Sequence, residues 1–134
     1  MLGNWQREAR RFAPSLTVRV LHGAGREDAA ALAEGADLVL TTYATAVRDA
    51  GALAGIGWDR VVLDEAQHIK NAGSGAARAV RRFPARNRIA LTGTPVENRL
   101  SELWSILDFV NPGLLASAHT FRARFAVPIE RYAE

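Results

Sequence analysis

Cysteine is absent from the 134-residue chain, which therefore has neither a disulfide framework nor a thiolate metal site. No run approaches the roughly 18 apolar residues that a membrane-spanning helix needs. Residues 1–11 also lack the apolar core of a signal peptide. Together these absences fit a reducing compartment, so we expect an intracellular protein, cytoplasmic or nucleoid-associated, with no membrane partner.

Lysine is nearly absent as well, since Lys70 stands alone beside sixteen arginines and the net charge is only +3. Arginine keeps its charge and binds phosphates with a planar fork. A compositional bias and nucleic-acid binding are both open explanations, because so modest an excess permits binding without requiring it. One arginine cluster is open to two interpretations, a solvated helix face or a contact with DNA or a partner. Its members are Arg78, Arg81, Arg82, Arg86 and Arg88.

What the chain does have is an alternation of short apolar runs with alanine-rich segments of helical periodicity. The runs expected as strands are 16–21, 37–42, 60–65 and 88–93. The segments expected as helices are 4–13, 26–35, 43–53 and 74–83. Such alternation is typical of a parallel sheet flanked by helices, so the predicted fold class is α/β.

The last third of the chain is different in character. Leu100, Leu103, Trp104 and Leu107 recur at helical spacing, which predicts an amphipathic helix whose apolar stripe packs on the core. A weaker helical pattern follows over 118–134, and we expect Pro128 to interrupt it.

Three of the expected strands end in polar groups, at the edge where open parallel sheets bind ligands. These groups are Thr41 with Thr42, Asp64 with Glu65, and Thr92 with Gly93, Thr94 and Pro95. We expect all three to face one crevice.

Asp64 follows a buried strand, where a carboxylate can hold a Mg²⁺ ion that bridges nucleotide phosphates. Glu65 beside it can orient or deprotonate an attacking water. The alternative for Asp64 alone is a simple helix cap. The "LTGTP" run adds hydroxyls around a glycine that permits close approach, with Pro95 turning the chain. The two strand ends together favour a nucleotide site.

The segments "DEAQHIKN" (64–71) and "LTGTPVENRLSELWSILDFVNPGLL" (91–115) closely resemble the Swi/Snf-type branch of the superfamily II helicase-like ATPases. Residues 4–18 and 37–49 resemble that family's motifs Ia and Ib. The resemblance covers nearly the whole chain, in family order.

The resemblance implies an ATPase with two RecA-like lobes that clamp ATP with Mg²⁺ and move along duplex DNA. Residues 1–115 would be part of the first lobe, and 116–134 a helical extension toward the region between the lobes. The second lobe of the same protein, duplex DNA and ATP would be the partners.

The resemblance also implies roles for single residues. Asp64 would bind Mg²⁺, Glu65 would activate water, and Gln67 would sense the nucleotide. Thr92, Gly93 and Thr94 would couple hydrolysis to movement. The candidates for the DNA backbone track are Asn4, Trp5, Thr41 and Thr42. For Trp5, packing on the sheet and stacking on a base both stay open. For His68, a structural role or a role in coupling is favoured over metal binding. Lys70 matches the family without an assigned role.

A phosphate-binding G-x-x-x-x-G-K-[ST] loop is missing from the sequence, and the glycine-bearing segment 22–28 lacks its spacing. We therefore expect an incomplete RecA-like sheet, without the Walker A strand and the second lobe, cut from a longer protein. The isolated chain should be inactive and poorly soluble. Alternatives are a non-catalytic DNA- or protein-binding module, against which the Asp64–Glu65 pair argues, and a non-functional remnant of a disrupted gene.

Overall fold

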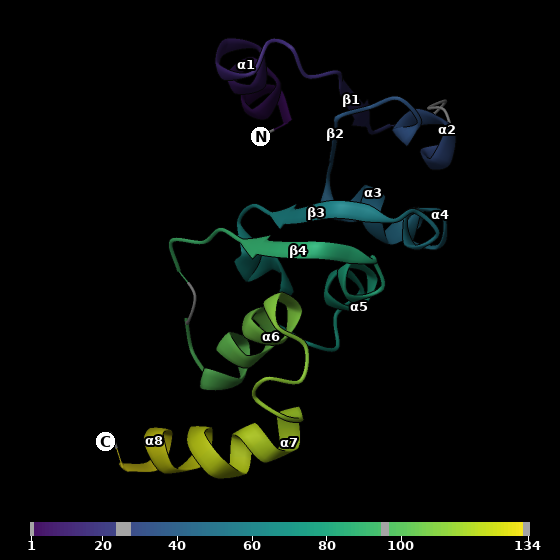
Figure 1. The fold of residues 1–134 in the computed structure, drawn as a ribbon. Coiled ribbons are helices and arrows are strands. Elements are labelled where there is room, and N and C mark those ends of the chain that lie inside the picture. Colours follow the sequence, from purple (N-terminus) through teal and green to yellow (C-terminus); the bar gives the residue numbers. More distant parts are fainter. Residues whose placement is uncertain (1, 24–27, 95–96, 133–134) are drawn as a thin grey trace. The chain divides into compact units, whose positions relative to one another are not determined.

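The computed structural model describes residues 2–23, 28–94 and 97–132. The chain divides into two compact units, Met1–Ile56 and Gly57–Glu134. Each unit contains a two-stranded parallel sheet with helices around it, which confirms the α/β class (Figure 1). The predicted turn at Pro95 and the start of the predicted helix 26–35 lie outside the described residues. The predicted functional division at residue 115 stays a prediction.

The N-terminal unit follows the predicted order of helices and strands. Strands β1 and β2 pair in parallel, in a register from Val18↔Leu38 to Leu21↔Thr41. The elements are α1 (Leu2–Phe12), β1 (Val18–Leu21), α2 (Ala29–Ala33), β2 (Leu38–Thr41), α3 (Tyr43–Arg48) and α4 (Ala50–Ala54).

The predicted helix 43–53 is in fact two helices, and Asp49 is the reason. Its backbone (φ −103°, ψ 20°) leaves helical geometry, so Asp49 ends α3 and begins α4. Buried Ala46, Ala50 and Leu53 still keep both short helices on the core of this unit. An alanine-rich periodicity does not reveal such a break, because alanine fits both segments equally well.

The C-terminal unit contains the second parallel pair, β3 and β4. The partner offset is 27 residues throughout, from Trp58↔Ala85 to Leu63↔Ala90. Both strands begin and end two to three residues earlier than predicted. The elements are β3 (Trp58–Leu63), the 3₁₀ helix η1 (Ala66–Ile69), α5 (Gly75–Arg81), β4 (Ala85–Ala90), α6 (Leu100–Val110), α7 (Ala118–Phe121), the π-helical η2 (Arg122–Ala126) and α8 (Val127–Tyr132).

The core of this unit lies on one face of the β3–β4 pair, where α5, α6 and η1 pack (Figure 1). Because paired residues share a face, Val62 and Ile89 lie together on the opposite face, and they are 44% and 38% exposed. The core side chains are Leu63, Ile69, Val80, Phe83, Ile106 and Phe109. Their burial fixes η1, the segment after Asp64 and Glu65, against α5 and α6.

The predicted packing stripe of α6 is confirmed only in part, since Leu100, Leu103 and Trp104 are half-buried. The buried residues of this helix are Ser105, Ile106 and Phe109, whereas Leu107 is 36% exposed. The most buried face is therefore displaced from the predicted stripe toward Ser105, a polar residue that the apolar pattern skips and that is hydrogen-bonded there.

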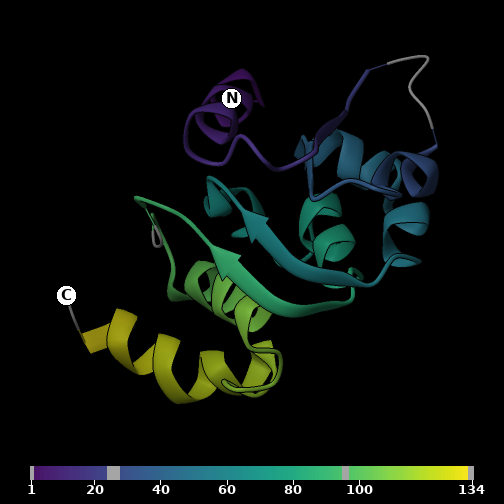
Figure 2. The ribbon, with the colours of Figure 1, turned by 45° about the horizontal axis from the view of Figure 1, so that its top comes forward.

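Pro128 does not interrupt the C-terminal helix, contrary to expectation. Figure 2 shows α7, η2 and α8 as one continuous helical rod. Immediately before the proline the helix widens, and the Val127 N–H donates to the Arg122 carbonyl, five residues back. A π-helical turn of this kind rearranges the carbonyls around a residue that has no N–H to donate, so the rod continues through Pro128. Among the described residues, no helix is long and apolar enough to cross a bilayer.

Candidate active site

The parallel ladder of β3 and β4 continues past both strand ends and brings two predicted segments together. The Leu91 N–H donates to the Leu63 carbonyl over 2.8 Å, and the Ala66 N–H donates to the Leu91 carbonyl over 2.9 Å. Beyond Leu63 the register changes: the Ala66 N–H and the Gln67 side chain bond to the residues 25 positions later, Leu91 and Thr92. The acidic pair and the Thr-Gly-Thr run therefore lie side by side at the carboxyl edge of the sheet.

Glu65 turns the chain sharply at this edge. Its backbone is left-handed (φ 49°, ψ 53°), a conformation that costs a residue with a side chain about 1–2 kcal/mol. The Glu65 N–H donates to Asp64 Oδ1 over 2.9 Å. The turn places both half-buried carboxylates between the end of β3 and the start of η1.

A continuous hydrogen-bonded chain links the acid to the neighbouring strand end. Gln67 Nε2 donates to Glu65 Oε2 over 2.6 Å, and Thr92 Oγ1 donates to Gln67 Oε1 over 2.7 Å. The Thr94 N–H in turn donates to Thr92 Oγ1 over 3.1 Å. Because the Gln67 amide uses its donor and its acceptor at once, a displacement of Glu65 changes the bonding available to Thr92.

A second polar contact joins the same two segments one turn further on. Lys70 Nζ lies 2.5 Å from Glu97 Oε2. This hydrogen bond raises the pKa of Lys70 above its ordinary value. Glu102, in the first turn of α6, accepts from the Glu97 and Asn98 N–H groups over 3.0 and 3.3 Å. The bond from the Glu97 N–H lowers the pKa of Glu102.

A buried polar cluster supports η1 from the other side. Ser105 is fully buried, and its hydroxyl donates to the Ile69 carbonyl at the end of η1. The same oxygen accepts from Arg81 Nη2 over 3.0 Å, while Arg81 Nη1 donates to the Ala72 carbonyl over 3.1 Å. Arg81 also lies over the Trp104 ring, 5.5 Å from its centroid. The segment that follows the acid pair is thus bonded to both α5 and α6.

Two members of the arginine cluster fit neither prediction made for it. Arg81 is bonded inside the unit, and Arg88 donates to the Phe109 and Phe83 carbonyls over 3.2 and 2.9 Å. Both guanidinium groups serve the fold, since they donate to backbone carbonyls in a loop and near helix ends, which would otherwise lack a protein partner among the described residues. Arg78, Arg82 and Arg86 are exposed.

The remaining predicted residues belong to the N-terminal unit. Asn4 is exposed on α1, where its Oδ1 accepts from Arg7, and Trp5 is half-buried. The Thr41 hydroxyl donates to the Leu21 carbonyl over 2.7 Å. Thr42 caps α3, since its Oγ1 accepts from the Thr45 N–H over 3.2 Å. Both threonines therefore have structural tasks already.

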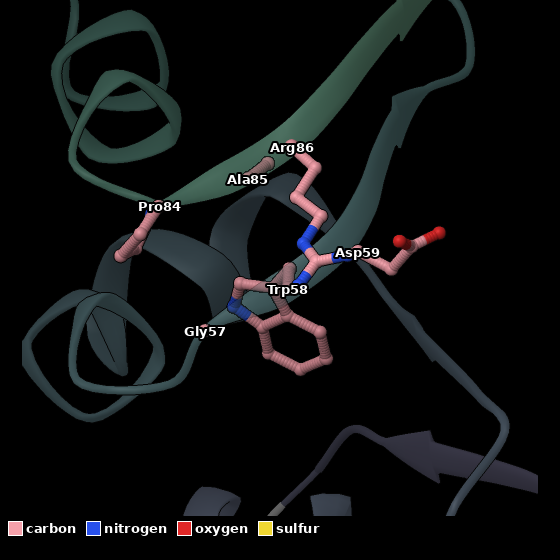
Figure 3. Close-up of a pocket in the computed structure, with 6 residues that line it drawn as sticks. All are labelled: Gly57, Trp58, Asp59, Pro84, Ala85 and Arg86. Atoms are coloured by element: carbon pink, nitrogen blue, oxygen red, sulfur yellow. The ribbon is translucent and has the colours of Figure 1, made fainter.

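A pocket of about 480 Å³ lies at the other end of the β3–β4 pair (Figure 3). Figure 3 shows Trp58 and Arg86 extending from adjacent strands beside Asp59. The pocket is lined by none of the residues predicted for the nucleotide site, and it lies at the amino ends of β3 and β4. Ligands of open parallel sheets bind at the carboxyl ends, so we place the candidate site at Asp64, Glu65 and Thr92 instead.

Sequence reasoning missed Glu97, Glu102, Ser105 and the inward arginines. Only Glu102 carries a readable signal, because a glutamate at the third residue of a helix often bonds backward to the preceding N–H groups. The others depend on partners far away in the sequence, as Ile69 and Ser105 do.

The family described as "SNF2-related domain" matches residues 1–134. A putative ATP-dependent helicase/translocase of Bacillus subtilis is 48% identical over 98% of this chain, which spans 14% of that protein. The ISWI chromatin-remodeling complex ATPase ISW2 of Saccharomyces cerevisiae is 35% identical over 90% of this chain, and the match covers 11% of the length of ISW2.

A solved structure agrees with these sequence matches. The Sulfolobus solfataricus SWI2/SNF2 ATPase core in complex with double-stranded DNA superposes with a TM-score of 0.85 at 43% identity. The match covers 98% of this chain and 27% of that one. This likeness confirms the predicted RecA-like fold class and the predicted resemblance, and this chain spans a small part of each relative.

Proposed function

Because this chain belongs to the family of SNF2-related domains, a family of helicase-like ATPases, we propose that it is part of the first lobe of an ATP-driven motor that moves along duplex DNA. The observation that supports this most strongly is the polar chain Glu65–Gln67–Thr92–Thr94 at the carboxyl edge of β3 and β4. In a motor, the acid that activates water would be linked to the segments that move during hydrolysis. These hydrogen bonds provide such a link from Glu65 to Thr94.

Each residue of the site has a chemical role in the proposal. Asp64 would be the carboxylate ligand of Mg²⁺. Glu65 would orient the attacking water and accept its proton, which a carboxylate at the edge of a ligand crevice is suited to do. Gln67 would respond to the state of Glu65. Thr92, Gly93 and Thr94 would pass that response to the segment that leads into α6.

The donor set suits magnesium bound together with a nucleotide. No group of three or more His, Asp or Glu residues gathers in the part of the chain that the structure describes. Mg²⁺ commonly binds one or two carboxylates and completes its shell with phosphates and water, so Asp64 alone would be a sufficient protein contribution. Bound with ATP, the ion would supply charge neutralisation at the phosphates.

The phosphate-binding half of such a site is missing from this sequence, which has no G-x-x-x-x-G-K-[ST] loop. We therefore propose that these 134 residues alone neither bind ATP tightly nor hydrolyse it. The Walker A loop and a second RecA-like lobe would be supplied by other parts of a longer protein.

The proposed DNA track runs through the N-terminal unit. Asn4 and Arg7 are exposed on α1 and suit the backbone of DNA, because amides and guanidinium groups contact phosphates without reading sequence. Trp5 remains a candidate on the same helix. Thr41 and Thr42 remain candidates too, but a phosphate would compete with the present acceptors of their hydroxyl protons.

A chimera tests the proposal. This chain would replace the matching segment of the Sulfolobus ATPase core, to which it is 43% identical. We expect ATP hydrolysis stimulated by duplex DNA, and we expect Glu65→Gln to lower the rate about a hundredfold or more. Glu34→Gln, at an exposed position of the N-terminal unit, is the matched control.

Three results would contradict parts of the proposal. A folded chimera with unchanged activity after Glu65→Gln would remove Glu65 from the chemistry. Tight Mg²⁺-dependent ATP binding by the isolated chain would refute the need for a P-loop. Salt-sensitive duplex binding by the chain, together with an inactive chimera, would favour the non-catalytic binding module.

A further inference from the structure

Lys70 makes a second contact between the segment that begins with Asp64 and Glu65 and the segment that begins with Thr92. The first join is the Thr92–Gln67 hydrogen bond. The second is the Lys70–Glu97 ion pair, whose partners are 27 residues apart in the sequence. Lys70 directly follows η1, and Glu97 lies shortly before α6. Along the second segment, the two contacts are therefore made at Thr92 and at Glu97, five residues apart.

Glu97 is itself held by the helix that follows it. The Glu102 carboxylate accepts from the Glu97 and Asn98 N–H groups, which fixes the backbone of this stretch to the first turn of α6. The Glu97 side chain is therefore presented to Lys70 from an anchored backbone. An ion pair between anchored segments loses less side-chain entropy than one between free side chains.

The stabilisation gained from such a contact is small, because both partners are more than one-third exposed. Exposed ion pairs contribute little to the free energy of unfolding. Such a contribution still shifts a local opening equilibrium by up to about fivefold, and a contact at one end of a short covalent segment restricts where the other end can lie. Here the other end carries Thr92 and Thr94.

We infer that Lys70 and Glu97 are positioning residues that hold the Thr92–Thr94 segment in bonding distance of Gln67, and thereby keep the link from Glu65 intact. This inference rests on the proposed function for its importance to catalysis. The geometric part stands alone. Removal of the Lys70 charge should loosen the Gln67–Thr92 contact, although the hydrogen bonds of Gln67 and Thr92 described above do not involve Lys70.

The composition of the chain simplifies the interpretation of a substitution at Lys70. Lys70 is the single lysine, so a substitution there changes no similar group elsewhere. Lys70→Met keeps the length of the stem and removes the charge. Lys70→Arg keeps the charge and is the conservative rescue. The pair Lys70→Glu with Glu97→Lys reverses the contact while keeping both charges. Arg60→Met is the matched control, because Arg60 is exposed and pairs only with its neighbour Asp59 among the ion pairs described.

The measurement is NMR on the whole 134-residue chain, at a dilution at which sedimentation velocity shows it to be monomeric, without nucleotide or DNA. Two signals report on the link: the side-chain amide resonances of Gln67 and the hydrogen-exchange rate of the Thr94 amide. We expect Lys70→Met to shift the Gln67 resonances and to raise Thr94 exchange about two- to fivefold. Lys70→Arg and the charge-reversed pair should restore both signals, and Arg60→Met should leave them unchanged.

Unchanged Gln67 and Thr94 signals in Lys70→Met would overturn the inference. So would equal changes in Arg60→Met, which would show a general response to the loss of a surface charge, and so would a charge-reversed pair that behaves like Lys70→Met. The experiment involves no hydrolysis and no DNA, so its failure leaves the proposed function untouched. Failure of the chimera likewise leaves this geometric result in place.

Discussion

Glu65 holds a backbone conformation that disfavours any residue with a Cβ atom, at the position where the proposed chemistry needs a carboxylate. Such strain persists only where surrounding bonds impose it. Here the bonds are those of the Glu65 N–H to Asp64 and of the Ala66 N–H to the Leu91 carbonyl. The strained backbone lowers the local stability, and it sets the orientation of the Glu65 carboxylate.

Replacing Glu65 by glycine or by alanine separates the strain from the loss of the carboxylate. Both variants lose the bond from Gln67, but only glycine accepts the left-handed conformation without steric cost. Glycine also makes the unfolded chain more flexible, which offsets part of that gain. We expect Glu65→Gly to be more stable than Glu65→Ala by roughly 0.5–1 kcal/mol, as measured by urea denaturation. Equal stability would mean that the turn relaxes when the side chain is removed.

At the scale of residues, the sequence was informative where chemistry follows a local pattern. Asp64 and Glu65 stand out because two acids close an apolar run, and in the structure Gln67 links Glu65 to Thr92. Arg81 and Arg88 were not predictable in the same way. An arginine on a helix or strand suggests solvent contact, and only the folded chain brings the carbonyls of Ala72, Phe83 and Phe109 within reach of them.

At the scale of elements, Ser105 is where α6, α5 and η1 are joined. Its hydroxyl is fully buried, donates to Ile69 and accepts from Arg81. We expect Ser105→Ala to lower the free energy of unfolding by about 1–3 kcal/mol, because it leaves the Ile69 carbonyl and one Arg81 N–H without this partner. Thermal or denaturant unfolding followed by circular dichroism would measure the loss.

Ser101→Ala is the matched control for Ser105→Ala, since Ser101 lies on the exposed side of the same helix. Alanine is the better helix former, so this change should alter stability by no more than about 0.5 kcal/mol. If the two variants were equally stable, the bonds of Ser105 would have no net value.

The types of the elements were predictable, whereas their faces and breaks were not. The strand runs were apparent from apolar composition, but the buried side of α6 depends on Ser105, which a hydrophobicity pattern counts as polar. The split at Asp49 and the widened turn before Pro128 likewise arise from backbone bonding that side-chain periodicity does not encode.

At the scale of the whole molecule, β4 is paired on one side only, with β3, among the described residues. An unpaired strand edge beside half-exposed apolar side chains such as Ile89 and Leu91 is a template for association with other chains. The isolated chain should therefore self-associate as its concentration rises, which sedimentation velocity would detect.

Ile89→Lys should reduce this association, because a charge beside an edge strand opposes pairing with another strand. Leu16→Lys adds the same charge at a similarly exposed position outside the described strands, and should reduce association less. A chain that remains monomeric at high concentration and unfolds in one cooperative step would contradict the prediction.

The family and the α/β class were predictable from the sequence because several motifs occur in order along nearly the whole chain. The pairing of β1 with β2 and of β3 with β4, and the register of each pair, were not predictable, since similar apolar runs admit several registers. Burial on one face and the bonds beyond the strand ends select one of them.

The rod at the end of the chain has a consequence for how a piece of this protein can be excised. The Leu100 N–H, at the first residue of α6, donates to Glu130 Oε1 over 2.8 Å, and Arg99 before it provides no side-chain cap. A boundary drawn after residue 115, where the recognisable motifs end, would leave that N–H without its carboxylate. A boundary that preserves this bond must therefore lie beyond residue 130, past the end of the motifs.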